Sequence, residues 1–291
     1  MQLKSYLTIS SVVVMWGLSF ILLKLGLDSI TPLSLALFRF LLLFPLIFSR
    51  LYRYRHGLWS RIQENWKHFS LLGFTGVTLY HAFQNYSLSL TTASNASLII
   101  STNPILITIF DHITNRESVN RSQVLGILVA FFGVILVIRP LDWTLNPIGV
   151  FGDILSVGSA GSWALYSAYS KTMVARYGAE QVTWLSILFG TVYLFPITVL
   201  LEFPQVPSSL LIWTLLFVMS FLCSGLAYLL WSKALEELSP TRAGVFLYFL
   251  PVVSVSLATL VLAEAVDSLF LIGASFIIVG VYMTQRYSKS D

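Results

Sequence analysis

The sequence predicts an all-α integral membrane protein: ten transmembrane helices arranged as two inverted five-helix repeats around a central cavity. Of its 291 residues, 56% are hydrophobic and only 10% are charged, and the mean hydropathy is +0.81, whereas soluble domains carry about a quarter charged residues. Apolar stretches of about 20 residues, the length that an α-helix needs to cross a bilayer, recur along the chain. The third observation is an internal repeat with an offset of 147 residues.

The repeat relates residues of the same type in the two halves of the chain. The matched pairs include Trp16 with Trp163, Lys24 with Lys171, Pro104 with Pro251, Gly126 with Gly273, and Gly133 with Gly280. Self-similarity at a fixed period is the signature of a duplicated structural unit, and in an apolar chain it is typical of two-fold-symmetric membrane transporters. We therefore expect two units, residues 1–140 and residues 141–291.

Ten helices are predicted from the apolar stretches and from the turn-forming residues between them. They are expected over residues 6–27, 32–50, 67–90, 92–113, 121–139, 149–173, 180–202, 209–235, 239–262 and 266–286. The one longer connection, residues 50–67, is also the most basic. A basic connection of this kind can contact anionic lipid headgroups.

The distribution of Lys and Arg predicts the orientation, because cytoplasmic segments carry the excess of basic residues. With the N-terminus inside, the inner segments hold 14 of the 17 Lys and Arg residues, and the outer loops hold only Arg139. The remaining two, Lys24 and Arg39, lie within predicted helices. We therefore expect both termini in the cytoplasm and the protein in the cytoplasmic (inner) membrane.

An odd number of helices in each unit means that the second unit enters the membrane from the opposite face. Inverted repeats place a solute near the bilayer midplane, between the units, and let one side open as the other closes. The net charge of +4 is explained by the basic inner segments. We expect a small-molecule substrate and the lipid bilayer as partners, and no nucleic acid. The sequence leaves the oligomeric state open and is compatible with a monomer.

Two basic residues within predicted helices are candidates for function, because charge inside a membrane is costly. Arg39 lies about 10 Å of helix rise past Pro32 and would anchor a carboxylate if it reaches the cavity. The alternative is that it caps backbone carbonyls or extends to the outer surface. Lys24 lies four residues before Asp28, on the same helical face, so a local ion pair is expected there.

A polar stripe and a set of aromatic residues are expected to line the cavity. His81, Gln84 and Asn85 share one helix face, and the offset maps His81 onto Tyr228. The predicted substrate-binding residues are Trp16, Arg39, Tyr80, His81, Asn85, Trp163, Tyr166, Tyr228, Trp231 and Tyr248. Such a surface suits a flat, partly apolar solute that is held by stacking and a few hydrogen bonds.

Small and helix-breaking residues also recur at matched positions. Pro104 and Pro251 each remove a backbone donor and loosen the helix, so we expect them to act as paired bending points for gating. Gly126 and Gly133, like their counterparts in the second unit, are seven residues apart and allow helices to approach closely.

The sequence lacks the motifs of membrane enzymes and motors. It contains no phosphate-binding Gly-Lys-Ser/Thr loop, no zinc-protease pattern and no Gly-x-Ser-x-Gly motif. Its single cysteine, Cys223, excludes an intramolecular disulfide and a cysteine-rich metal site. We therefore expect no enzymatic activity, no cofactor and no metal. No Asp or Glu lies deep within a predicted helix, so proton coupling through His81 and plain downhill exchange both stay open.

Several motifs mark the starts and ends of the two units. The first unit begins with Trp16-Gly17-Leu18-Ser19-Phe20, Lys24 and Arg39-Phe40. It ends with residues 93–104, Gln123, Gly126 and Gly133. The second unit ends with residues 240–251, Gly273 and Gly280. Together these motifs resemble the EamA-type members of the drug/metabolite transporter (DMT) superfamily over nearly the whole chain. The resemblance implies ten helices around a central cavity and export of amino acids, related metabolites or drug-like compounds. Tyr80, His81, Trp163 and Tyr166 are similar to the cavity lining of the aromatic amino-acid exporters in this group.

We therefore expect a transporter that exports amino acids, aromatic ones among the candidates, or related small metabolites by alternating access. Within the same class, the alternative is an importer or exchanger of phosphorylated sugars or nucleotides. Such a solute would need more basic residues in the cavity than Lys24 and Arg39 supply. From other classes, the alternatives are a lipid-scrambling protein, which needs a polar groove open to lipid, and a receptor or scaffold, which predicts no flux.

Overall fold

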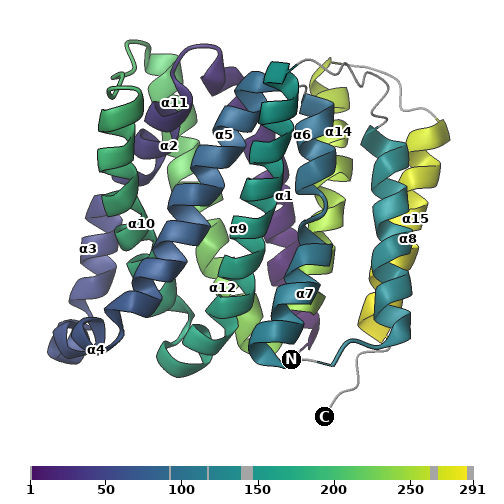
Figure 1. Ribbon diagram of the computed structural model, residues 1–291, viewed down its shortest axis with the longest axis horizontal. Helices are drawn as coiled ribbons and strands as arrows, with labels where there is room; N and C mark the ends of the chain where they lie inside the picture. Colours follow the sequence, from purple (N-terminus) through teal and green to yellow (C-terminus); the bar gives the residue numbers. More distant parts are fainter. Residues whose placement is uncertain (1, 92, 117, 139–146, 263–267, 287–291) are drawn as a thin grey trace.

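The computed structural model describes residues 2–91, 93–116, 118–138, 147–262 and 268–286, and its regular structure there is helical throughout (Figure 1). In the first half the helices are α1 (Gln2–Leu27), α2 (Pro32–Leu41), α3 (Phe44–Tyr52), α4 (Arg55–Gly73), η1 (Phe74–Leu79), α5 (Tyr80–Leu90), α6 (Ala93–Ile100), α7 (Asn103–Asn115) and α8 (Arg121–Ile138). In the second half they are α9 (Pro147–Tyr177), α10 (Ala179–Leu201), α11 (Leu210–Val218), η2 (Met219–Leu226), α12 (Ala227–Glu237), α13 (Pro240–Gly244), η3 (Val245–Tyr248), α14 (Phe249–Leu262) and α15 (Ser268–Arg286). The predicted boundary between the units and Arg139 lie outside the described residues.

Over the described ranges these helices join end to end into ten rods, in agreement with the ten predicted spans. Figure 1 shows the rods standing side by side, with the start of α1 and the end of α15 on the same face. We call this face the termini face and the opposite one the distal face. Nine helical segments in the described part of the chain are long and apolar enough to cross a membrane. The remaining rod, α4–η1–α5, is the one that carries the polar stripe of His81, Gln84 and Asn85.

Two of the rods are interrupted just before a proline. α2 ends at Leu41 and α3 begins at Phe44, because the ring of Pro45 clashes with the carbonyl four residues earlier and cannot donate to it. A turn likewise separates α6 from α7 immediately before Pro104. On the matched rod, the 3₁₀ stretch η3 precedes Pro251.

The basic connection predicted over residues 50–67 is largely helical, which corrects the expectation of a loop. α4 begins at Arg55, and its axis is broken at His56 and Gly57, where Gly57 has a φ of +86° that favours glycine. Trp59 is 69% exposed on this segment. The nearby Arg61 donates to Gln181 of α10 at 2.8 Å, so this segment is attached to the second unit.

The last rods of the two units, α8 and α15, pack closely along a seam of glycines (Figure 1). A methyl group placed on Gly280 would lie 2.4 Å from the carbonyl oxygen of Gly126, and one on Gly133 would lie 2.6 Å from that of Gly273. The two backbones can therefore approach only because these positions lack a Cβ. The predicted packing role of the glycine pairs is thus visible as contact between the two units.

We expect Gly280→Ala to lower the free energy of unfolding by about 1–3 kcal/mol, because the added methyl overpacks the seam against the backbone. Gly161→Ala is the matched control, since a Cβ at Gly161 meets nothing within 4 Å. That substitution should be neutral or stabilise the helix by up to about 1 kcal/mol. Thermal unfolding in detergent measures both variants, and equal shifts would contradict the seam.

Candidate functional site

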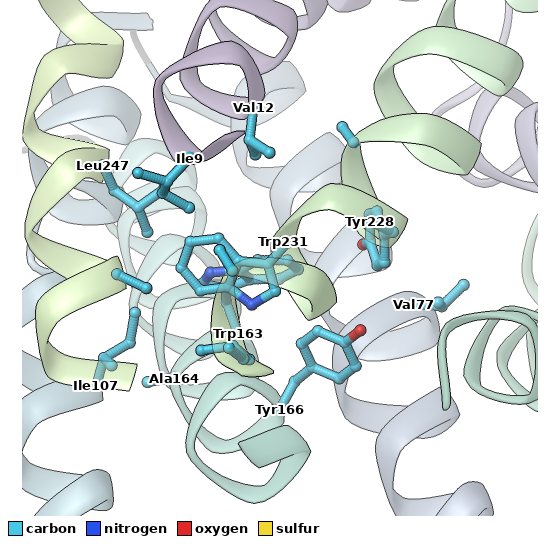
Figure 2. Packing of buried hydrophobic residues seen from close by; sticks show 14 of the residues in the cluster. Ile9, Val12, Val77, Ile107, Trp163, Ala164, Tyr166, Tyr228, Trp231 and Leu247 are labelled. Atoms are coloured by element: carbon cyan, nitrogen blue, oxygen red, sulfur yellow. The ribbon is translucent and has the colours of Figure 1, made fainter. Parts of the chain in front are cut away.

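A cluster of aromatic residues fills the middle of the molecule between the two units. The rings of Trp16 and Trp163 meet edge to face at a centroid distance of 4.9 Å, and Trp163 lies 5.5 Å from Trp231. Figure 2 shows Trp163, Tyr166, Tyr228 and Trp231 converging within the buried core. Trp163 is only 2% exposed and Trp231 is fully buried. Residues predicted as cavity lining are therefore packed against one another.

Matched residues of the two units touch each other in this cluster. Trp16 contacts Trp163, and His81 Nε2 lies 3.0 Å from the hydroxyl of Tyr228, each pair being 147 positions apart. Residues related by a two-fold axis can touch their own counterparts only beside that axis. The cluster therefore marks the pseudo-two-fold axis between the repeats.

Two π-helical stretches at matched positions provide backbone acceptors for the cluster. In η1 the carbonyl of Gly76 accepts a hydrogen bond from the Tyr228 hydroxyl at 2.7 Å. In η2 the carbonyl of Cys223, the counterpart of Gly76, accepts from Trp16 Nε1 at 2.9 Å. Short π-helical segments within α-helices are frequent at functional sites. Here each π-stretch holds an aromatic side chain from the other unit.

These contacts fix the tautomer of the neutral His81 ring. The single proton of the Tyr228 hydroxyl is donated to the Gly76 carbonyl, which cannot donate in return. The hydroxyl oxygen must then accept from His81, so Nε2 carries the hydrogen. In this tautomer Nδ1 is an acceptor. Nδ1 is buried, and within the described ranges it has no hydrogen-bond partner.

Arg39 of α2 is buried beside this cluster rather than extended to the surface. It is 2% exposed, its Nε donates to the hydroxyl of Ser224, and its guanidinium lies 5.8 Å from the Phe40 ring. Among the described residues, Arg50–Glu180 is the only ion pair, so no carboxylate neutralises Arg39 there. A buried cation without a counter-ion is costly, and its remaining donors are available to an anion.

Arg39 lines a small chamber that we call the Arg39 chamber. The other residues of this chamber are Trp16, Ser19, Phe20, Leu23, Tyr80, His81, Gln84 and Tyr228. Its volume is about 20 Å³, which is room for about one water molecule. A larger solute therefore requires residues of the chamber wall to move.

The structure brings five of the predicted binding residues to this chamber: Trp16, Arg39, Tyr80, His81 and Tyr228. Trp163, Tyr166 and Trp231 belong to the aromatic cluster beside it. The other two lie elsewhere. The amide of Asn85 donates to the Pro32 carbonyl at 2.9 Å, and Tyr248 packs near Phe131 of α8.

Sequence reasoning missed Ser19, Phe20 and Leu23 of α1 as chamber residues. They follow Trp16 at helical spacings of three, four and seven positions, which place all of them on one face. This helical spacing from Trp16 could have indicated in the sequence that they line the same site. Gln84 belonged to the predicted stripe, and it donates to the Tyr80 hydroxyl at 3.0 Å.

The matched lysines Lys24 and Lys171 differ in their surroundings. Lys171 donates to the carbonyls of Leu235 and Leu238 at the end of α12, at 2.7 and 3.2 Å, where a cation favours the helix C-terminus. Lys24 is exposed and forms no ion pair with Asp28 within the described ranges, so the expected local pair is wrong. The physical reason is that two exposed charges gain little from pairing in water.

The termini face carries a further polar tie between the units. The carboxylate of Asp111 at the end of α7 accepts from the amide and hydroxyl of Thr241 in α13, at 2.9 and 2.7 Å. Asn115 donates to the carbonyl of Ala168 in α9 at 3.0 Å. These bonds hold α7 against the second unit on the termini side of the aromatic cluster.

We expect Tyr228→Phe to lower the free energy of unfolding by about 1–3 kcal/mol. The variant leaves the Gly76 carbonyl and the Nε2 hydrogen of His81 buried without their partner. Tyr282→Phe, at a position 59% exposed, is the control and should unfold like the parent protein in detergent. An unchanged Tyr228→Phe would show that this hydrogen-bond network does not stabilise the axis.

Comparison with known proteins identifies the fold and the family. A solved crystal structure superposes with a TM-score of 0.82 over 99% of each chain, at 20% sequence identity, and so has the same fold. An "uncharacterized transporter" of Archaeoglobus fulgidus is 32% identical over 98% of both chains. A "probable amino-acid metabolite efflux pump" of Escherichia coli K12 is 27% identical over 94% of this chain and 91% of its own length.

The family match covers both halves of the chain. The model of the EamA-like transporter family matches residues 3–139 and again residues 150–286. Together with the inverted repeats and the membrane-spanning helices, this match defines the class of the protein. The chain belongs to the EamA-like transporter family of the DMT superfamily and is a multi-pass membrane transporter.

Proposed function

We propose that this transporter exports amino acids, or closely related small metabolites, across the cytoplasmic membrane by alternating access. In this proposal both termini lie in the cytoplasm, and the substrate binds where the aromatic cluster meets the Arg39 chamber. The "probable amino-acid metabolite efflux pump" of Escherichia coli K12 supports the substrate class, since it is similar over nearly the whole chain.

The observation that carries the proposal is the buried guanidinium of Arg39 in the chamber wall, which pairs with no carboxylate among the described residues. A planar guanidinium matches a carboxylate through two parallel hydrogen bonds. One cation balances one carboxylate. A monocarboxylate is therefore the anion that this site fits best.

The same chamber offers an acceptor for the other end of an amino acid. Nδ1 of His81 is unprotonated in the tautomer that Tyr228 selects, and it has no partner among the described residues. An α-ammonium group can donate to such a nitrogen. Arg39 and His81 thus provide complementary groups for a zwitterion, and the indole rings of Trp16 and Trp163 supply apolar surface for the remainder.

The geometry argues against a phosphorylated substrate. A phosphate monoester carries close to two negative charges at neutral pH, whereas Arg39 is the only Lys or Arg among the described residues that line the chamber. Lys171 is engaged by the carbonyls at the end of α12. Lys24 is exposed at the distal end of α1.

Arg39→Gln should raise the KM for the transported amino acid by about 10- to 100-fold. It removes a charged hydrogen-bonding partner that is worth about 1.5–3 kcal/mol. The assay is counterflow of radiolabelled alanine, leucine and phenylalanine in proteoliposomes. Arg53→Gln, at an exposed position outside the chamber, is the control and should transport normally. Unchanged counterflow in Arg39→Gln would refute carboxylate binding by this residue.

The inverted repeats also predict how the two lysines alternate. In the opposite state of the transporter each unit adopts the conformation of the other, so Lys24 should cap the carbonyls of Leu88 and Thr91, the counterparts of Leu235 and Leu238. Lys171→Gln weakens the present tie and should therefore populate that opposite state.

Cross-linking between cysteines at positions 28 and 91, in a Cys223→Ser background, measures this shift and leaves Lys24 and the backbone carbonyls in place. We expect its yield to rise at least about twofold when Lys171→Gln is added, a shift of roughly 0.4 kcal/mol in the two-state equilibrium. Lys233→Gln, an exposed lysine of α12, is the control and should leave the yield unchanged. An equal yield in both variants would contradict the exchange of roles.

A further inference from the structure

A second and larger pocket lies beside the Arg39 chamber. It has a volume of about 210 Å³ and is lined by residues of α1, α6, α7, α8, η3 and α14. Its walls include Phe20, Ile100, Asn103, Val137, Leu250 and Val255. We call it the Asn103 pocket. It has about ten times the volume of the Arg39 chamber, where a solute larger than one water cannot be contained.

Phe20 is the wall that the two compartments share, since its side chain lines both. Among the described residues Phe20 takes part in no ring contact, unlike Trp16 one turn earlier, which touches Trp163, Tyr228 and Trp231. Trp16 is also held by its hydrogen bond to the Cys223 carbonyl. Phe20 therefore lacks the ring contacts and the hydrogen bond that hold Trp16 in place.

The chemistry of the Asn103 pocket differs from that of the Arg39 chamber. Among the described residues that line it, none is Lys, Arg, Asp or Glu, and their surface is mostly hydrocarbon. The hydroxyls of Ser101 and Ser254 already donate to the carbonyls of Ser97 and Gly17. The carboxamide of Asn103 is 3% exposed, and its Oδ1 has no hydrogen-bond partner within the described part of the chain.

We propose that the Asn103 pocket is the specificity pocket for the side chain of the transported amino acid, and that it selects neutral, apolar side chains. This inference rests on the proposed function: the carboxylate end is held at Arg39, and the side chain passes Phe20 into the neighbouring volume. An acidic side chain is rejected, because no Lys or Arg among the described lining residues replaces its hydration. A side chain that carries one N–H group, such as an indole, is accepted because Asn103 Oδ1 can pair with it.

The test compares the counterflow of a large and a small amino acid in variants whose pocket is filled by a larger side chain. Val137 of α8 lines the pocket wall, so Val137→Phe should reduce phenylalanine counterflow at least about tenfold relative to alanine counterflow. One methylene more or less in an apolar pocket changes discrimination by about 10- to 200-fold. Val255→Phe fills the pocket from α14 and should give the same change if Val137→Phe fails to fold.

Leu128→Phe, on the exposed face of the same helix at 53% exposure, is the matched control and should leave both fluxes unchanged. Equal loss of phenylalanine and alanine flux in Val137→Phe and Val255→Phe, or no loss in either, would overturn the specificity pocket while leaving amino-acid export intact. Efficient counterflow of glutamate by the parent protein would also overturn it. Absence of counterflow for every amino acid in the parent protein would instead refute the proposed function, and this inference with it.

Discussion

The burial of the Arg39 guanidinium is the constraint on which the rest of the structure depends. A central arginine costs about 2.5–3.5 kcal/mol on membrane-insertion scales, and within the described ranges no carboxylate offsets this cost. The fold responds with polar groups from both units, including the hydroxyl of Ser224 and the wall of the Arg39 chamber. These polar groups must themselves be satisfied, which explains the hydrogen bonds from side chains to the carbonyls of the two π-helical stretches. A buried polar site inside a membrane therefore requires a hydrogen-bond partner for each of its polar groups.

Residues of the two units contact their own counterparts at the pseudo-two-fold axis, and the side-chain interactions there also depart from the symmetry. Trp16 and Trp163 are the same residue type, yet within the described ranges only Trp16 donates to its matched carbonyl, because Tyr228 occupies the carbonyl of Gly76. His81 and Tyr228 are different residue types at matched positions, and this difference makes their direct hydrogen bond directional. The two π-helical stretches at matched positions keep the symmetry in the backbone. The side chains at the axis depart from it and give the Arg39 chamber its own chemistry.

Much of the fold could be predicted from the sequence, because apolar length and a fixed repeat are strong signals in a membrane protein. Residues of the site could be predicted from the sequence only where a pattern marked them. For His81 this pattern was the helical spacing of polar residues, and for Trp16 it was the match to Trp163 in the second unit. Asn85 lies one position from Gln84, but it points to the Pro32 carbonyl, and pattern alone cannot distinguish the two directions. The sequence did not indicate that Phe20 separates the two pockets, because that role depends on how α1 packs against α14. The helical character of α4 was hidden by its basic composition, which is equally typical of a loop.

The glycine seam between α8 and α15 has a consequence for how the chain is made. α8 ends at residue 138 and its partner begins at residue 268, so the glycine face of α8 must wait for the last helix to leave the ribosome. At roughly 5–20 residues per second, the interval is on the order of 6 to 26 seconds. During that time the backbone of α8 near Gly126 and Gly133 faces lipid or a temporary neighbour in the insertion machinery. The two symmetry-related helices of the seam are thus made at different times, and their contact can form only after α15 has been synthesised.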